Sequence, residues 1–349
     1  MITLARVDGQ TTFRVGDRGP SGVLRARPFW VAVVLAVLVF LCFCLGLTFG
    51  DYPVTVVDAM RALFWYGDPT TVDIVYDLRL PRVLVGLLVG SAFGLAGAVF
   101  QTLARNALAS PDVIGVAEGA NTAAVAGIVF GFGASLGTST TALLGALASA
   151  TAIYLLAWRR GTTGYRIVLV GIGVSALFTS LTSYLLQRAD VFQAQRAVLW
   201  LTGSLNLREW KHVGPLAGAV LVLVPVVLLM SRWLSGLMLG DDTARGLGVP
   251  VQKARLALML AGVGLVAFAT AAAGPVAFVS LVSPQIGLRL ARRPTPPLVV
   301  SALTGALVVL AGDLLARPFG LPVGVVTGAI GAPYLLWLLS RAKRLGSGA

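Results

Sequence analysis

The sequence predicts an all-α polytopic membrane protein with about ten transmembrane helices. Of its 349 residues, 57% are hydrophobic and 12% are charged, whereas soluble globular domains carry about 25% charged residues. Eight long stretches contain no Asp, Glu, Lys, Arg or His, and a helix needs about 20 apolar residues to cross the hydrocarbon of a bilayer. The basic residues concentrate in alternate loops between these stretches, which is the pattern that orients a membrane protein.

The uncharged stretches define the predicted spans in chain order. They are 29–50, 83–104, 119–158, 167–187, 213–231, 256–288, 294–312 and 318–340. Two are too long for one helix: the third has a glycine-containing break at 131–137, and the sixth is interrupted by Gly274-Pro275. Glycine and proline mark helix ends and turns, so each of these two holds two helices and eight stretches give ten. The first stretch is predicted to be a retained helix, because it is long and lacks a small-x-small cleavage site.

The polar segments define the domain organisation. We predict a disordered cytoplasmic tail over residues 1–28, because this segment is polar and contains several Gly and Arg residues. A transmembrane domain follows over 29–341, with a polar loop at about 234–253, and residues 342–349 form a second cytoplasmic tail. With both termini inside, 19 of the 27 Lys and Arg residues face the cytoplasm and 8 face outward, which supports this orientation.

Composition and motif content argue against several function classes. A net charge of +13 would suggest nucleic-acid binding in a soluble chain, but here the arginines are topology signals in loops. His212 is the only histidine, which excludes a multi-histidine metal site, and Cys42 and Cys44 give no metal spacing and no expected disulfide. The chain lacks a GxxxxGK(S/T) phosphate loop, so it does not hydrolyse ATP in that way. Acidic residues lie in loops or at span ends, which argues against an ion-coupled secondary carrier.

Glycines recur at a spacing of four in two spans. They are Gly86, Gly90 and Gly94, and again Gly320, Gly324 and Gly328. Such ridges let helices approach closely in lipid, where burial of apolar surface gives little driving force. Generic helix packing is the simpler interpretation of these glycines, and a direct role in a substrate path is the alternative.

A series of motifs resembles one transport family. They occur in family order and span roughly residues 77–340: LRLPR at 78–82, RNALASPDVIG at 105–115, WLTGSLN at 200–206, LGDDTARGLGVPV at 239–251, GPVAFVSLVSPQIGLRL at 274–290, and GDLLARPFGLPVGVVTGAIGAPYLLWLL at 312–339. The chain resembles the FecCD/BtuC-type permease subunits of bacterial ABC importers for iron–siderophores, haem and cobalamin. The resemblance implies a type II ABC importer permease fold with ten helices and both ends inside, which agrees with the count above.

The resemblance also implies a docking face. In the family, the arginines of the LRLPR motif and the arginine after GDLLA lie on the outer face and dock acidic residues on the two lobes of a substrate-binding protein. These positions are Arg79, Arg82 and Arg317 here. Asp77 lies beside the first two in the sequence and Asp313 beside the third, and both are expected to hold the arginines in place. A planar guanidinium suits carboxylates, and opposite charge speeds encounter. The alternative is that Arg79 and Arg82 only cap the start of a helix and contact lipid headgroups.

A second implied site lies in the polar loop. Acidic residues suit the first turn of a short helix that begins after Gly240 and ends near Gly246. In the family this loop forms the coupling helices that sit in a groove of the ATPase. The expected contacts are Asp241, Asp242, Ala244, Arg245, Gly246 and Leu247. The alternative is a solvated cytoplasmic hairpin.

The third implied region is the translocation path, which in the family lies between two permease subunits and is lined largely by the fifth and tenth helices. The hydroxyl residues of the corresponding stretches are Ser175, Thr179, Ser183 and Thr327. Ordinary hydrogen bonding of these hydroxyls back to their own helix is an equally good interpretation.

Two departures from the family pattern bear on the substrate. Many members have Pro-His where this chain has Pro284-Gln285, and RNPLA where it has Arg105-Asn106-Ala107. The Gln form is similar to that of ferric enterobactin-type permease subunits. Both changes favour a heterodimer over a homodimer and a ferric siderophore over cobalamin. Gln does not titrate as His does, which removes a protonation role at that position.

The resemblance therefore implies a non-enzymatic subunit in the bacterial cytoplasmic (inner) membrane. Its partners would be a second permease chain, two ATPase subunits that bind ATP and Mg, and an extracytoplasmic siderophore-binding protein, with no nucleic acid. Iron would travel inside its chelate, so no cofactor or metal ligand is expected on this chain. The alternatives are a cobalamin or haem importer of the same architecture, a secondary carrier, and a non-transporting membrane scaffold.

Overall fold

The computed structural model describes residues 2–7, 10–15, 21–24, 26–50, 52–111, 115–157 and 164–346. The remaining parts of the two predicted tails, and residues 112–114 of the RNALASPDVIG motif, lie outside the described residues.

Each of the ten predicted spans falls on a helix of its own. These helices are α1 (Ala26–Thr48), α4 (Leu80–Ala104), α5 (Val116–Val129), α7 (Thr138–Ala157), α8 (Gly164–Arg188), α10 (Trp210–Leu229), α13 (Val251–Ala273), α14 (Val279–Ala291), α15 (Leu298–Ala316) and α16 (Val323–Gly346). Among the described residues, seven helices are long and apolar enough to cross a membrane, and Val116–Val129 and Val323–Trp337 are shorter apolar helices. The chain is therefore a multi-pass membrane protein.

Shorter elements connect these helices. They are α2 (Val56–Ala62), α3 (Pro69–Asp73), the π-helix η1 (Ile74–Arg79), α6 (Gly133–Leu136), α9 (Val191–Leu201), α11 (Ser231–Met238), α12 (Asp241–Gly246) and the 3-10 turn η2 (Arg317–Phe319). Both predicted breaks are confirmed: α5 and α7 are separate helices, and α13 ends at Gly274, whose φ of 77° lies in the left-handed region that favours glycine.

The N-terminal segment differs from the predicted disordered tail. Three antiparallel strands, β1 (Ile2–Val7), β2 (Gln10–Val15) and β3 (Ser21–Leu24), form a small sheet in the order β1-β2-β3. Val7 pairs with Gln10, so a two-residue connection joins β1 to β2. The sequence there is Asp-Gly, a strong hairpin signal between β-prone segments that a prediction from composition alone overlooks. The first helix also begins at Ala26, three residues before the predicted span.

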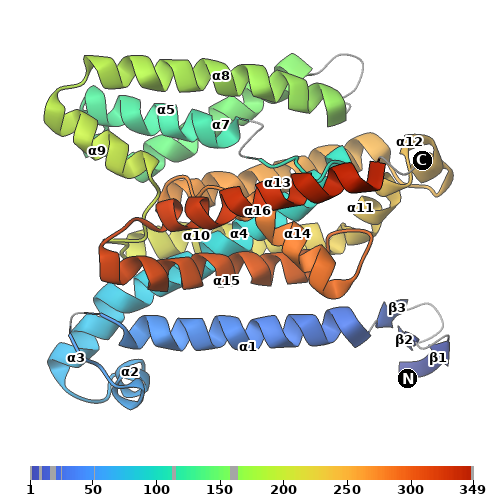
Figure 1. The fold of residues 1–349 in the computed structure, drawn as a ribbon, viewed down its shortest axis with the longest axis horizontal. Coiled ribbons are helices and arrows are strands. Elements are labelled where there is room, and N and C mark those ends of the chain that lie inside the picture. The colour runs from blue at the N-terminus through green and yellow to red at the C-terminus, as the bar shows by residue number, and fades with distance from the viewer. Residues whose placement is uncertain are drawn as a thin grey trace.

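The core forms around α4 and α13. In the most apolar part of each helix, 78% of the residues of α4 and 72% of those of α13 are buried, against 17% in α8 and in α10. Helices α4 and α13 are therefore central, and α8 and α10 are peripheral. Figure 1 shows α1 along one side of the bundle and α8 along the opposite side, with α4, α13, α14, α15 and α16 between them.

The glycine ridge of α4 lets it lie directly against α15. A Cβ added at Gly90 would lie 2.4 Å from the carbonyl oxygen of Gly305, and one at Gly94 would lie 2.2 Å from that of Ser301. The packing interpretation therefore holds for this ridge. In the second predicted ridge only Gly324 is in such contact, 2.0 Å from the carbonyl oxygen of Thr202, while Cβ atoms at Gly320 and Gly328 would meet open space.

The bundle has two distinct ends. Figure 1 places α2, α3 and α9 at one end, called here the α9 end, and α11 and α12 at the other, called the α12 end. The N-terminal sheet and the end of α16 both lie at the α12 end (Figure 1). Helix α4 runs between the two ends, so the residues before it and after it reach opposite surfaces.

Candidate functional site

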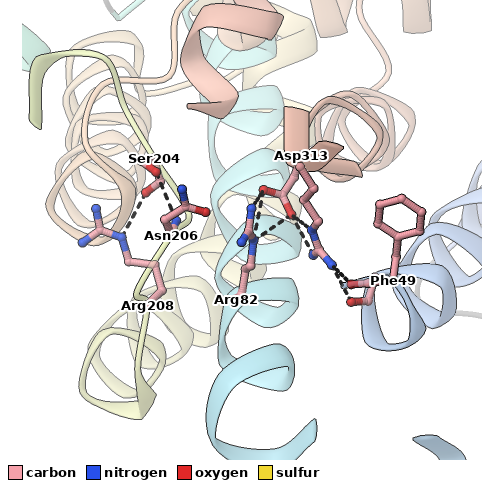
Figure 2. A network of polar contacts seen from close by, with 8 residues as sticks. Phe49, Arg82, Ser204, Asn206, Arg208 and Asp313 are labelled. Atoms are coloured by element: carbon pink, nitrogen blue, oxygen red, sulfur yellow. Dashed lines mark hydrogen bonds and ion pairs between the residues drawn. The ribbon is translucent and has the colours of Figure 1, made fainter. Parts of the chain in front are cut away.

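A buried carboxylate binds two of the predicted docking arginines at the α9 end. Asp313, 2% exposed in the last turn of α15, accepts hydrogen bonds from Arg82 Nε and Nη2, the latter at 2.8 Å. It also accepts from Nε and Nη2 of Arg317, at 2.9 and 2.8 Å. Figure 2 shows Asp313 facing Arg82 across this contact. Charge-assisted bonds of this kind fix both guanidinium groups in one geometry, as the sequence prediction for Asp313 expected.

The end of α1 is bound by Arg79 and by the remaining guanidinium nitrogen of Arg317. Arg317 Nη1 donates to the carbonyl oxygens of Gly46 and Phe49, at 2.8 and 2.9 Å. Arg79 is buried, and its Nη1 donates to the carbonyl oxygens of Leu47 and Thr48, at 2.9 and 2.8 Å. The last carbonyls of a helix lack partners within it, so these arginines cap α1. Arg79 therefore binds the end of α1, which differs from the alternative in the sequence analysis that it caps the start of a helix and contacts lipid headgroups.

The three arginines line one cavity of about 380 Å³, together with Asn206 and Gly320. Among the described contacts of this cavity, Asp313 pairs with Arg82 and Arg317, and the three guanidinium groups make the lining rich in hydrogen-bond donors. A further arginine lies nearby: Arg208 donates from Nε to the Ser204 carbonyl oxygen at 3.0 Å, beside Asn206 (Figure 2). Burial lowers the pKa of Arg208 to about 10, so it stays charged at neutral pH. The cavity can attract an acidic group.

Five of the six predicted coupling residues lie in α12 and Leu247 directly follows it, and the expected short helix is confirmed with its acidic first turn. Its first residue is held from two sides. Asp241 Oδ1 accepts from Arg255 Nη2 of α13 at 2.8 Å and lies 3.5 Å from Nη2 of Arg105, which follows α4. The same Arg105 nitrogen donates to the Leu237 carbonyl oxygen at 2.7 Å. These bonds attach α12 to the two central helices.

The other predicted coupling residues, in α12 and just after it, differ in exposure. Asp242, Arg245, Gly246 and Leu247 are exposed, and Arg245 Nη1 donates to Asp242 Oδ1 at 2.7 Å. Ala244 is fully buried in the main core cluster, so it anchors the helix and presents no surface in this conformation. The exposed residues offer one polar face with Leu247 beside it.

The predicted path residues do not form one group. Ser175, Thr179 and Ser183 follow one another at a spacing of four on α8, and Thr179 and Ser183 are exposed. The Thr179 and Ser183 hydroxyls donate to the carbonyl oxygens four residues earlier, at 2.9 and 3.0 Å. Thr327 is buried on α16 and donates to the Gly324 carbonyl oxygen at 3.1 Å. All three bonds match the back-bonding alternative.

Two further contacts escaped the sequence prediction. Gln285 Nε2 donates to Gln101 Oε1 at 2.6 Å, and Gln101 Nε2 donates to the Leu281 carbonyl oxygen at 2.9 Å, with both side chains buried between α4 and α14. The attachment of Asp241 by Arg105 and Arg255 was also missed. Arg105, Asp241 and Gln285 lie in the motifs quoted above, whereas Gln101 and Arg255 do not. The partners Gln101 and Gln285, like Arg105 and Asp241, are more than 100 positions apart and leave no local signal.

The order of motifs and helices matches a known family. The sequence model of the FecCD transport family covers residues 37–341. The chain belongs to the FecCD transport family. This membership covers nearly the whole helical part, including the arginine cavity and α12.

Curated relatives and a solved structure agree with the assignment. The FecCD-family chain is 40% identical over 304 residues to the ferric enterobactin transport system permease protein FepG of Escherichia coli (strain K12), covering 86% of this chain and 92% of that one. It is 34% identical over 330 residues to the iron(3+)-hydroxamate import system permease protein FhuG of Bacillus subtilis (strain 168), covering 91% and 98%. A solved structure described as an inward-facing metal-chelate type ABC transporter matches with a TM-score of 0.79 at 27% identity, over 89% and 99% of the two chains.

Proposed function

We propose that this chain is a membrane-spanning permease subunit of an ABC importer that moves a ferric siderophore into the cytoplasm. The observation that carries the proposal is the similarity, over most of both chains, to permeases named for ferric enterobactin and iron(3+)-hydroxamate. A third such relative, the Fe(3+) dicitrate transport system permease protein FecD of Escherichia coli (strain K12), is 37% identical over 328 residues. Iron would pass as a chelate, with no metal ligand or cofactor on this chain.

The proposed assembly lies in the bacterial cytoplasmic membrane. It contains a second, unlike permease subunit, two ATPase subunits that bind ATP and Mg, and an extracytoplasmic binding protein. All ten helices would cross the bilayer in the type II importer fold, with the α12 end in the cytoplasm. The positions of the N-terminal sheet and the end of α16 at that same end (Figure 1), together with the positive-inside pattern, support this orientation.

Docking of the binding protein would use the cavity of Arg79, Arg82 and Arg317. The three arginines are not equally available to a binding protein, because Arg79 and Arg317 also bond to carbonyl oxygens of α1. In the contacts described above, Arg82 bonds to Asp313, and its side chain, 21% exposed, is more accessible than those of Asp313 and Arg317. An incoming carboxylate would add to the Asp313 contacts without displacing them.

We expect Arg82→Gln to slow association of the binding protein roughly tenfold and to reduce the salt dependence of that rate, since charge complementarity acts mainly on the encounter. Asp313 would keep its bonds to Arg317, so the fold should survive. The measurement is the association rate with the transporter in nanodiscs at several salt concentrations. Arg61→Gln is the control, because Arg61 is an exposed arginine in α2 at the same end. An equal effect of both variants would show that general surface charge, and not this cavity, guides docking.

Coupling to the ATPase would use the exposed face of α12, with Asp241 and Ala244 holding the helix in place. We expect Leu247→Asp to lower ATP-driven uptake by about thirtyfold, since loss of an interface hot spot costs about 2 kcal/mol or more. Leu247 is 64% exposed, so stability in detergent should not change. Leu239→Asp is the control, because Leu239 is 61% exposed in the same loop but outside the predicted contacts. Equal losses in both variants would contradict the assignment to α12.

The function itself is tested by uptake. Cells expressing the chain with its genomic neighbours receive radiolabelled iron as catecholate, hydroxamate and mixed siderophores, and separately labelled cobalamin or haem. Uptake of one ferric siderophore that requires the ATPase partner supports the proposal. Uptake of cobalamin or haem alone would overturn the substrate class, and uptake without the ATPase partner would indicate a secondary carrier. No uptake of any compound would favour a scaffold.

A further inference from the structure

A cavity of about 570 Å³ lies at the α12 end, away from the arginine cavity and from the exposed face of α12. It is bordered by the start of α1, by the junction of α10 and α11, and by the loop that leads into α15. Two of its lining residues are basic, Arg232 of α11 and Arg293 after α14. Among the lining residues that the structure describes, none is acidic. The volume is that of a small-molecule site, and the two guanidinium groups on its wall can bind an anion.

The remaining polar groups of this cavity also suit a phosphate. Helix α15 begins at Leu298 on its wall, and Pro297 provides no side-chain cap for that helix start. The first backbone N–H groups of a helix carry a partial positive charge and have no partner within the helix. Ser231 and Thr295 add hydroxyl groups to the lining. Guanidinium groups bind phosphate oxygens in a bidentate manner.

The other side of the cavity is apolar and belongs to membrane-spanning helices. Phe29 of α1, Leu228 of α10 and Val299 of α15 line it, and each is an exposed large hydrophobic residue. Two exposed tryptophans, Trp30 and Trp233, are the chain neighbours of lining residues Phe29 and Arg232. Tryptophan is enriched where hydrocarbon meets headgroups, and these two residues support a position of the cavity near that boundary.

We propose that this cavity binds an anionic phospholipid, with Arg232 and Arg293 at the headgroup phosphate and the α1–α10–α15 side against an acyl chain. Basic pockets between helices on the cytoplasmic side are suited to such headgroups. A bound lipid would join α1, α11 and α15. The far ends of α1 and α15 lead into the arginine cavity, and α11 leads into α12. The proposal requires a membrane protein but not a particular transported substrate.

The test measures lipid retained by the purified transporter complex after exchange into phosphatidylglycerol or phosphatidylcholine with the same acyl chains. We expect preferential retention of phosphatidylglycerol, and roughly thirtyfold weaker retention in Arg232→Gln/Arg293→Gln, since each basic residue near an anionic headgroup contributes about a factor of five. The matched control is Arg61→Gln/Arg188→Gln, which removes the same charge at exposed positions of α2 and α8. Equal retention by the wild type and the cavity variant would overturn the proposal, as would an equal loss in the control.

A second variant separates a lipid from free phosphate and does not depend on the arginines. Ala32→Phe adds volume on the apolar side of the cavity and leaves its charge intact. We expect it to reduce phosphatidylglycerol retention at least fivefold while binding of inorganic phosphate is unchanged. If millimolar phosphate displaces phosphatidylglycerol from the wild type, or if Ala32→Phe has no effect on the lipid, the site holds a free anion and the lipid assignment is wrong. Transport is not part of either readout, so these outcomes are independent of the proposed function.

Discussion

Gly94→Leu is expected to prevent the chain from folding. A Cβ at this position would lie 2.2 Å from the Ser301 carbonyl oxygen and 3.2 Å from the Gly305 Cα, so the clash is with the backbone of α15 and not with a movable side chain. Overpacking of a well-packed core typically costs about 1–3 kcal/mol. Here the whole α4–α15 contact must separate, so the cost should exceed that range and little folded protein should remain.

The measurement is the amount of monodisperse protein after detergent extraction, followed by its thermal unfolding. Gly218→Leu is the matched control, because Gly218 lies within α10 and a Cβ there meets nothing within 4 Å. We expect the control to fold like the wild type. Normal yield and unfolding temperature of Gly94→Leu would show that α4 and α15 do not pack as the structure describes.

Asp313→Asn should produce the second largest effect. The substitution keeps the volume of the side chain but removes the charge that pairs with Arg82 and Arg317. Loss of one partner from a buried ion pair costs about 3–5 kcal/mol, because the opposite charge stays buried without compensation. We therefore expect a lower unfolding temperature of the purified chain and loss of uptake in cells.

A double variant identifies the cause of this destabilisation. Adding Arg82→Met to Asp313→Asn removes one uncompensated charge and should recover part of the stability. Arg317→Met should recover less, because Arg317 also binds the end of α1 through the Gly46 and Phe49 carbonyl oxygens. Asp58→Asn is the control: its ion pair with Arg61 is exposed and 3.9 Å long, so a change below about 1 kcal/mol is expected. Equal destabilisation by the two Asn variants would show that burial of the Asp313 pairs is unimportant.

The structure addresses one part of the docking prediction, the position of the three arginines, and their bonds to α1 add a role that the sequence did not indicate. The motif arginines Arg79, Arg82 and Arg317 do converge on one cavity. Sequence alone did not indicate that Arg79 would bond to the carbonyl oxygens of the last two residues of α1, because a helix end becomes an acceptor site only when a donor from another helix reaches it. Docking by these residues stays a prediction.

The N-terminal strands show the opposite case, in which a local signal existed and was overlooked. Polar composition favoured disorder for residues 1–28, whereas the Asp-Gly pair between two β-prone segments favoured a hairpin. In the membrane domain, composition was the stronger signal, since lipid accepts only spans whose backbone groups are satisfied internally.

The sequence by itself determined which segments are apolar enough to span the membrane and where the two long apolar stretches are interrupted. Lipid requires long uncharged segments, and the breaks at 131–137 and Gly274 follow from local backbone preferences. Only the tertiary structure decided the partners of the polar groups inside: Asp313 with Arg82, Asp241 with Arg105 and Arg255, and Gln101 with Gln285. Apart from Asp241 and Arg255, these partners are more than 100 residues apart. Asp313 meets Arg82 because the glycines of α4 allow α15 to approach its backbone, and Gln101 meets Gln285 where Gly97 of α4 lies against Ser280 of α14.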